Sequence, residues 1–231
     1  MFGRIVFSES KKVTHRREEL AGITVETVCV PAHSPTRRRI RKAARLLCRA
    51  GVRHILVPPD FCHWPQMEEF GILPVDTVPF LQAMAVPLAL AVLAGFGVSP
   101  DRAAVVMAGR RASKAMRDAA VSLCPRIQQL VIFAPAGGAE LSDYLRREYG
   151  LPLLEQCRAP HLIMNFSEAE AGCKAPVLRL YDPAPDLLGC SVRPKTALLP
   201  NGCETTPFLS ALWESGRLSP CDIAVFPCEG T

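Results

Sequence analysis

In residues 103–122, an apolar run typical of a buried strand is followed by a glycine and then by a pattern typical of a helix. The sequence of this segment is AAVVMAGRRASKAMRDAAVS. A short apolar run rich in valine is typical of a buried strand, and the apolar spacing after Ser113 is typical of a helix. A strand that passes through a glycine turn into a helix is the architecture of a phosphate-binding turn, because helix amino termini offer unpaired N–H groups and partial positive charge.

Strand and helix patterns alternate on both sides of that turn. Expected strands lie at 4–7, 23–30, 54–58, 103–108, 129–134, 161–165, 177–181 and 222–227. Expected helices lie at 111–123, 138–149 and 206–216, with a further one that begins at Ser34 or Thr36 and ends at 50. This alternation favours an α/β fold with a Rossmann-like, doubly wound parallel sheet and a smaller amino-terminal βαβ lobe. We expect an amino-terminal lobe over 1–76, an apolar connecting helix over 77–98 and a Rossmann-like lobe over 99–231.

The stretch 77–98 is long and apolar enough to be tested as a membrane span. Pro79 and Pro87 interrupt it, and the acids Asp76 and Asp101 flank it instead of a cationic side that would mark orientation. We therefore expect a buried connecting helix, kinked at Pro87, and no membrane partner.

Cysteine and histidine usage limits the chemistry. The chain has ten cysteines and five histidines, without a C-x-x-C pair or a ligand-spaced histidine set, so no metal site is expected. Charged residues interrupt the first dozen positions, which does not fit a signal peptide, and we expect reduced thiols and a cytoplasmic protein.

Asp60, Cys62 and His63 follow an expected strand at its carboxyl end. Adjacent cysteine and histidine side chains can supply a nucleophile or a metal ligand. Neighbouring residues on an extended chain point apart, however, and Trp64 with the nearby prolines favours packing. Asp182, Asp186, Glu204, Lys195 and Asn201 lie in a long expected loop over 182–207, and such loops are often lids or binding segments.

The basic excess lies in one helix. The chain has a formal charge of +5, and residues 37–53 carry eight basic side chains and no acid. The expected helix places Arg37, Arg41, Arg45 and Arg49 in one stripe, which can meet nucleic-acid phosphates or an anionic membrane surface. The alternative is a solvated face paired with acids from elsewhere, and no aromatic interleaving or nucleic-acid module favours the nucleic acid. A regulatory or interaction protein that uses helix 37–49 is thus the second function considered.

The turn after strand 103–108 is the first candidate site. Ser113 can cap the helix or donate to a phosphate, and basic side chains add positive charge to the same corner. We predict a site for a small anionic ligand or nucleotide, the alternative being a solvated basic first turn. The candidate residues are Gly109, Arg110, Arg111, Ser113 and Lys114.

The segment VVMAGRRASKAM, residues 105–116, resembles the turn of the NADP-binding domain in the shikimate dehydrogenase family. The stretch 112–115, Ala-Ser-Lys-Ala, matches the family's helix start, whereas Arg110 and Arg111 replace two glycines of its loop. Side chains at those positions oppose close approach to a pyrophosphate. The resemblance covers about residues 101–181 and implies a Rossmann-like scaffold, an oxidoreductase-like activity and NADP as the cofactor to test.

The next strand offers a second test of that cofactor. Residues 133–138, Phe-Ala-Pro-Ala-Gly-Gly, contain neither a carboxylate for a ribose nor an arginine for a 2′-phosphate. The family's catalytic lysine and aspartate have no recognisable motif in residues 1–98. The sequence therefore predicts the scaffold and assigns no catalytic residue.

Overall fold

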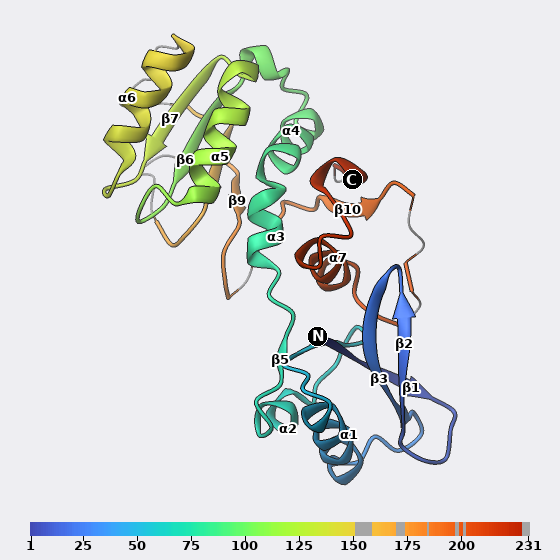
Figure 1. Cartoon of the computed structure of the whole chain (residues 1–231). Helices are drawn as coiled ribbons and strands as arrows, with labels where there is room; N and C mark the ends of the chain where they lie inside the picture. The colour runs from blue at the N-terminus through green and yellow to red at the C-terminus, as the bar shows by residue number, and fades with distance from the viewer. Residues whose placement is uncertain (151–158, 170–173, 184, 197–198, 201, 228–231) are drawn as a thin grey trace. The chain divides into compact units, whose positions relative to one another are not determined.

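The computed structural model describes residues 1–150, 159–169, 174–183, 185–196, 199–200 and 202–227, and the chain divides into two units (Figure 1). Unit 1 comprises Met1–Thr77 and Pro194–Ile223, and unit 2 comprises Val78–Arg193 and Ala224–Thr231. The predicted α/β class is confirmed, with parallel strands in a sheet of each unit. Residues 194–223, which the sequence assigned to the carboxyl-terminal lobe, belong to unit 1.

Unit 1 is built on a five-stranded sheet of order β2-β3-β1-β4-β5. Strand β1 (Phe2–Ser8) is parallel to β3 (Ile23–Pro31) and β4 (His54–Leu56), and β4 is parallel to β5 (Leu73–Pro74). The unpredicted edge strand β2 (Thr14–Leu20) is antiparallel to β3. Ala21 and Gly22 connect them, both with positive φ, as a two-residue hairpin turn matched to strand twist requires.

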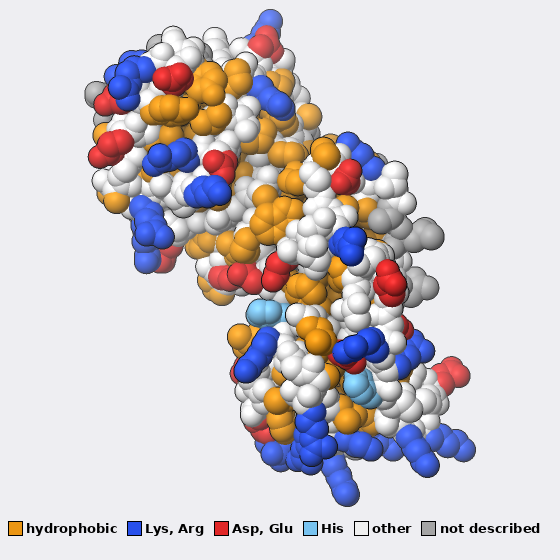
Figure 2. All heavy atoms as spheres, viewed as in Figure 1, with side chains coloured by type: hydrophobic (Ala, Val, Ile, Leu, Met, Phe, Trp, Pro, Cys, Tyr) orange, Lys and Arg blue, Asp and Glu red, His pale blue; other side chains and the backbone are white. Residues whose placement is uncertain are grey.

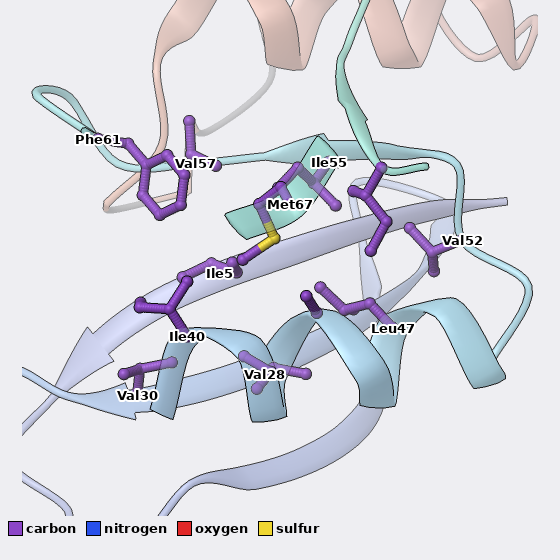
Figure 3. Close-up of a cluster of buried hydrophobic side chains, with 13 residues drawn as sticks. Ile5, Val28, Val30, Ile40, Leu47, Val52, Ile55, Val57, Phe61 and Met67 are labelled. Carbon is purple, nitrogen blue, oxygen red and sulfur yellow. The ribbon is translucent and has the colours of Figure 1, made fainter. Parts of the chain in front are cut away.

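Two helices cover one face of this sheet. Helix α1 (Arg37–Arg49) begins after Thr36, whose Oγ1 accepts a bond from the Arg39 N–H at 3.4 Å, and α2 (Trp64–Glu68) follows β4. Figure 3 shows Ile40 and Leu47 pointing from α1 toward the strands, where Ile5 and Val28 complete a buried apolar cluster. Burial of this face holds α1 on the sheet and leaves its basic face outward.

The other face of the sheet is covered by α7 (Thr205–Glu214). Phe208 of α7 is 1% exposed and belongs to a second cluster with Phe2, Val25 and Leu56. Because successive strand residues point to opposite faces, Ile55 joins the α1 side and Leu56 joins the α7 side.

Unit 2 contains a four-stranded parallel sheet of order β7-β6-β8-β9. Its strands are β6 (Ala104–Ala108), β7 (Gln129–Phe133), β8 (Leu162–Asn165) and β9 (Val177–Arg179). All five residues of β6 are buried, as expected of a central strand covered on both faces. Helices α5 (Lys114–Leu123) and α6 (Gly138–Tyr149) lie on opposite faces of the sheet (Figure 1).

The apolar stretch after residue 77 forms two helices, α3 (Val78–Ala83) and α4 (Ala85–Gly95), which separate at Met84. The expected single helix with a kink at Pro87 is wrong. Pro87 lies in the first turn of α4, where the missing N–H of proline costs no helical bond. No helix in the described part of the chain has both the length and the apolar character that crossing a bilayer requires.

The stretch 182–207, expected to be a loop, contains strand β10 (Ser191–Pro194). The predicted last strand, β11 (Ile223–Phe226), pairs with β10 in a two-stranded sheet and joins neither parallel sheet. Short 3-10 helices lie at Pro100–Arg102, Cys124–Arg126 and Pro220–Asp222.

Candidate functional site in unit 2

The order of the unit 2 strands creates a switch point between β6 and β8. From β6 the chain moves to β7 on one side, and α6 then returns it to β8 on the other side of β6. Open α/β sheets bind ligands beyond the carboxyl ends of their strands at this kind of position. Gly109 and Phe166 directly follow β6 and β8, so the predicted turn lies at the switch point.

Gly109 is closely packed. A Cβ at this position would lie 2.9 Å from Cε of Met116 and 3.2 Å from Oγ of Ser167. The Gly109 N–H donates to the carbonyl oxygen of Phe133 at 3.0 Å, which extends the β6–β7 pairing into the turn. The glycine therefore leaves the Met116 and Ser167 side chains in place beside the turn.

Arg110 is engaged by a segment that the sequence analysis did not identify. Its backbone N–H donates to Ser167 Oγ at 2.8 Å, and its guanidinium pairs with the Glu168 carboxylate. Ser167 and Glu168 lie just after β8, so a search for polar residues behind every predicted strand would have found them. The Ser167 hydroxyl oxygen thus accepts the hydrogen bond that the Arg110 amide would otherwise donate to a phosphate oxygen.

The other predicted residues lie at the start of α5. Ser113 caps this helix, its Oγ accepting the Met116 N–H at 3.2 Å, so its predicted capping role is confirmed. Arg111 and Lys114 are exposed. Ala112, which follows Arg111, donates its N–H to the Ala136 carbonyl at 2.8 Å.

An open hollow of about 500 Å³ lies at this edge of the sheet, where β6, β8 and β9 end. It combines two guanidinium groups with two carboxylates and a phenol. The Arg179 guanidinium lies over the Tyr181 ring, 5.9 Å from its centroid, in a cation–π arrangement. The lining residues are Arg110, Ser167, Glu168, Arg179, Tyr181, Asp182 and Pro183.

Asn165, the last residue of β8, leaves a polar atom unsatisfied next to these strand ends. Its side chain is buried, and its Nδ2 donates to the Ala169 carbonyl at 3.1 Å. No hydrogen-bond donor from the residues that the structure describes reaches its Oδ1. A buried acceptor without a donor is uncommon in folded proteins, and functional sites are one place where such atoms persist.

A dinucleotide does not fit the turn as described. The Arg110 amide is bonded to Ser167, and arginine side chains occupy two positions that a pyrophosphate loop keeps free. At the end of β7, Phe133 is 43% exposed and is followed by alanine, proline and glycine residues that provide no ribose partner. The residues at the ends of β6 and β7 therefore do not fit NADP.

The comparison of this chain with known proteins found distant structural similarity. No family model and no curated protein matches the sequence. Among solved structures, L-tryptophan dehydrogenase from Nostoc punctiforme aligns with a TM-score of 0.32 and 13% identity, over 62% of this chain and 44% of that enzyme. The matched region thus spans less than half of the enzyme's length, and the resemblance to shikimate dehydrogenases stays a prediction.

Cys62 and His63 lie closer than the sequence suggested. The Cys62 Sγ is 4.0 Å from His63 Nε2, whereas neighbours on an extended chain were expected to point apart. Asp60 just before them has a φ of 65°, which turns the chain. The expected packing role also holds, because the Phe61 ring contacts both His63 and Trp64 edge-on. Among the described residues, no His, Cys, Asp or Glu cluster could hold a metal ion.

The candidate residues expected in the loop over 182–207 lie in different parts of the structure. Asp182 lines the hollow, and the Asp186 backbone bonds that of Arg179. Lys195 donates its Nζ to the carbonyl of Cys221 at 2.8 Å, and Glu204 precedes α7 as its N-cap. Asn201 lies outside the described residues. The loop therefore contributes Asp182 to the candidate site.

Proposed function

We propose that unit 2 binds a small anionic ligand, a metabolite carrying a phosphate or carboxylate group, at the carboxyl ends of β6, β8 and β9. The observation that carries this proposal is the coincidence of the hollow with the topological switch point. Arg110 and Arg179 supply planar donors that match oxyanions. Neither the fold nor the site identifies a hydride-transfer reaction. The test below therefore includes nicotinamide cofactors, which an oxidoreductase would bind.

The mixed charge of the hollow limits the ligand further. Two carboxylates, Glu168 and Asp182, line it together with the two arginines, so an anion must displace or share the Arg110–Glu168 ion pair. A small ligand that carries an anionic group and a hydrogen-bond donor pairs with the arginines through the first and with the carboxylates through the second. Tyr181 adds an aromatic face and a hydroxyl for positioning.

Thermal unfolding of the purified chain tests the proposal. Inorganic phosphate, NAD, NADP, NADPH and ATP are added separately, and a ligand at 100 times its dissociation constant stabilises the protein by about 2.7 kcal/mol. We expect stabilisation by inorganic phosphate or ATP, and no larger shift with NAD, NADP or NADPH. A shift with nicotinamide cofactors alone favours the dehydrogenase alternative, and no shift with any compound contradicts the proposal.

Arg179→Gln is expected to weaken binding of the stabilising compound about 10- to 150-fold, because a charge-assisted bond contributes roughly 1.5–3 kcal/mol. Isothermal titration calorimetry measures the change, and Arg179→Lys should recover part of it by restoring the charge. Arg117→Gln is the matched control, since this exposed arginine of α5 does not line the hollow. Equal affinities in the Arg179 and Arg117 variants would remove the hollow as the site.

The double substitution Arg111→Glu and Lys114→Glu tests the turn itself. Both side chains are exposed at the start of α5, and reversing their charge places two carboxylates in the turn that adjoins the hollow through Arg110. We expect binding to be abolished while the far-ultraviolet circular dichroism stays unchanged. Unchanged affinity would show that the anion does not reach the turn.

A further inference from the structure

The outward face of α1 in unit 1 forms a strongly basic surface. A hollow of about 1080 Å³ lies along its first turns, and no carboxylate from the described part of the chain lines it. Figure 2 shows Lys and Arg side chains gathered along the lower edge of unit 1, where Figure 1 places α1. The lining residues, called here the α1 basic surface, are Thr36, Arg37, Arg38, Arg39, Arg41, Lys42 and Arg45.

Little of this charge is neutralised within the described chain. Arg37 and Arg41 share the carboxylate of Glu69, at 3.1 and 2.9 Å, and Arg45 lies over the Phe70 ring at 6.0 Å. The alternative considered from the sequence, a solvated face that pairs with acids from elsewhere, therefore applies to two of the six cations. Six basic groups and one carboxylate leave a formal charge of +5 on this surface.

The helix itself opposes this arrangement of charge. The first turn of α1 has no acidic residue, so cations crowd the helix end that carries partial positive charge. Like charges four residues apart also repel each other. Burial of the apolar face on the sheet keeps α1 folded despite both effects, and a bound polyanion would relieve them.

We propose that the α1 basic surface binds the phosphate backbone of double-stranded nucleic acid. From Arg37 to Arg45 the helix rises about 12 Å, at 1.5 Å per residue. One strand of a duplex presents a phosphate about every 3.4 Å along its axis, so three or four phosphates face this length. A row of cations on that scale fits a polyanion better than a single small anion.

A membrane surface fits the same helix less well. Interfacial helices bury an apolar face in the lipid beside their basic face. The apolar residues of α1 are already buried against the sheet, with Ile40, Ala43, Ala44 and Leu47 all at 0% exposure. No exposed aromatic lines the hollow to stack on a base, so we expect backbone contacts with little sequence preference.

Fluorescence anisotropy with a labelled 20-base-pair DNA duplex tests this proposal in the full chain. We expect the affinity to fall steeply with salt, and Arg38→Gln with Lys42→Gln to weaken binding about tenfold near 0.1 M salt. The slope of log affinity against log salt should decrease by about 2, because each phosphate contact contributes about 0.9. Both side chains are exposed, and neither joins an ion pair with a described residue.

The control is Arg117→Gln with Arg126→Gln, which removes the same charge from exposed positions of unit 2. An equal loss in this control would mean that net charge, not the α1 basic surface, causes binding. Binding to phosphatidylserine vesicles without binding to the duplex, or no duplex binding by the unmodified chain, overturns the proposal. Arg179→Gln should leave duplex binding unchanged, which keeps this test separate from that of the unit 2 hollow.

Discussion

Phe208→Ala is expected to lower the free energy of unfolding of unit 1 by about 3–5 kcal/mol, the range for removing a buried phenylalanine side chain. Phe208 is 1% exposed and packs in the cluster between α7 and the five-stranded sheet. Hydrogen exchange followed by mass spectrometry should show faster exchange in β1 and β3. Because the chain has two units, this local readout is more informative than a single melting temperature.

Phe96→Ala provides a residue-matched control, since Phe96 is 54% exposed. Its effect should stay within about 0.5 kcal/mol, as for most surface substitutions. If Phe208→Ala accelerates exchange only in β6 and β7, α7 would belong to unit 2 and the assignment of residues 194–223 would be wrong.

The sequence predicted local elements well where apolar periodicity is strong. The observed β6, α5, β7 and α6 lie within three residues of their expected bounds, because buried strands and amphipathic helices leave clear patterns. The edge strand β2 was missed for the opposite reason. Its sequence THRREEL is nearly all polar, and backbone pairing with β3 forms it without an apolar face.

The organisation of the chain was harder to predict. Helix α7 has an apolar pattern that fits any sheet face, and its partners Phe2 and Val25 lie about 200 residues earlier. A local pattern cannot say which sheet a returning segment covers. For the same reason β11 was recognised as a strand, but its pairing with β10 was not.

Of the residues predicted in the turn, Arg110 lines the hollow of the candidate site, whose role stays a prediction. The glycine turn identified Gly109 and the start of α5, because that signal is contiguous in sequence. Ser167, Glu168 and Arg179 come from two later strands, and only the order β7-β6-β8-β9 brings them to the same edge. Since strand order is a tertiary property, sequence spacing could not show that these residues share one edge of the sheet.

Glu26 is expected to make stability depend on pH. Its buried carboxylate accepts bonds from Arg17 Nε at 2.6 Å and pairs with His15 Nε2 at 2.7 Å, both from β2. The Arg17 hydrogen bond is the main cause that lowers the Glu26 pKa, while burial opposes it and His15 adds to the lowering. A lowered folded-state pKa means that the ionised group stabilises unit 1 above its unfolded pKa, and that this contribution is lost as pH falls through the folded value.

Glu26→Gln should therefore lower the free energy of unfolding of unit 1 by about 2 kcal/mol at pH 7, since hydrogen bonds to charged groups contribute roughly 1.5–3 kcal/mol. The difference from the unmodified chain should shrink as the pH falls from 7 to 3, because protonation removes the same charge. Urea denaturation with hydrogen exchange at β2 and β3 measures it. Glu214→Gln is the control, an exposed glutamate at the end of α7 that should change little at either pH. A difference that is constant with pH would mean that shape, not charge, makes Glu26 stabilising, and that β2 is held at the sheet edge by backbone pairing alone.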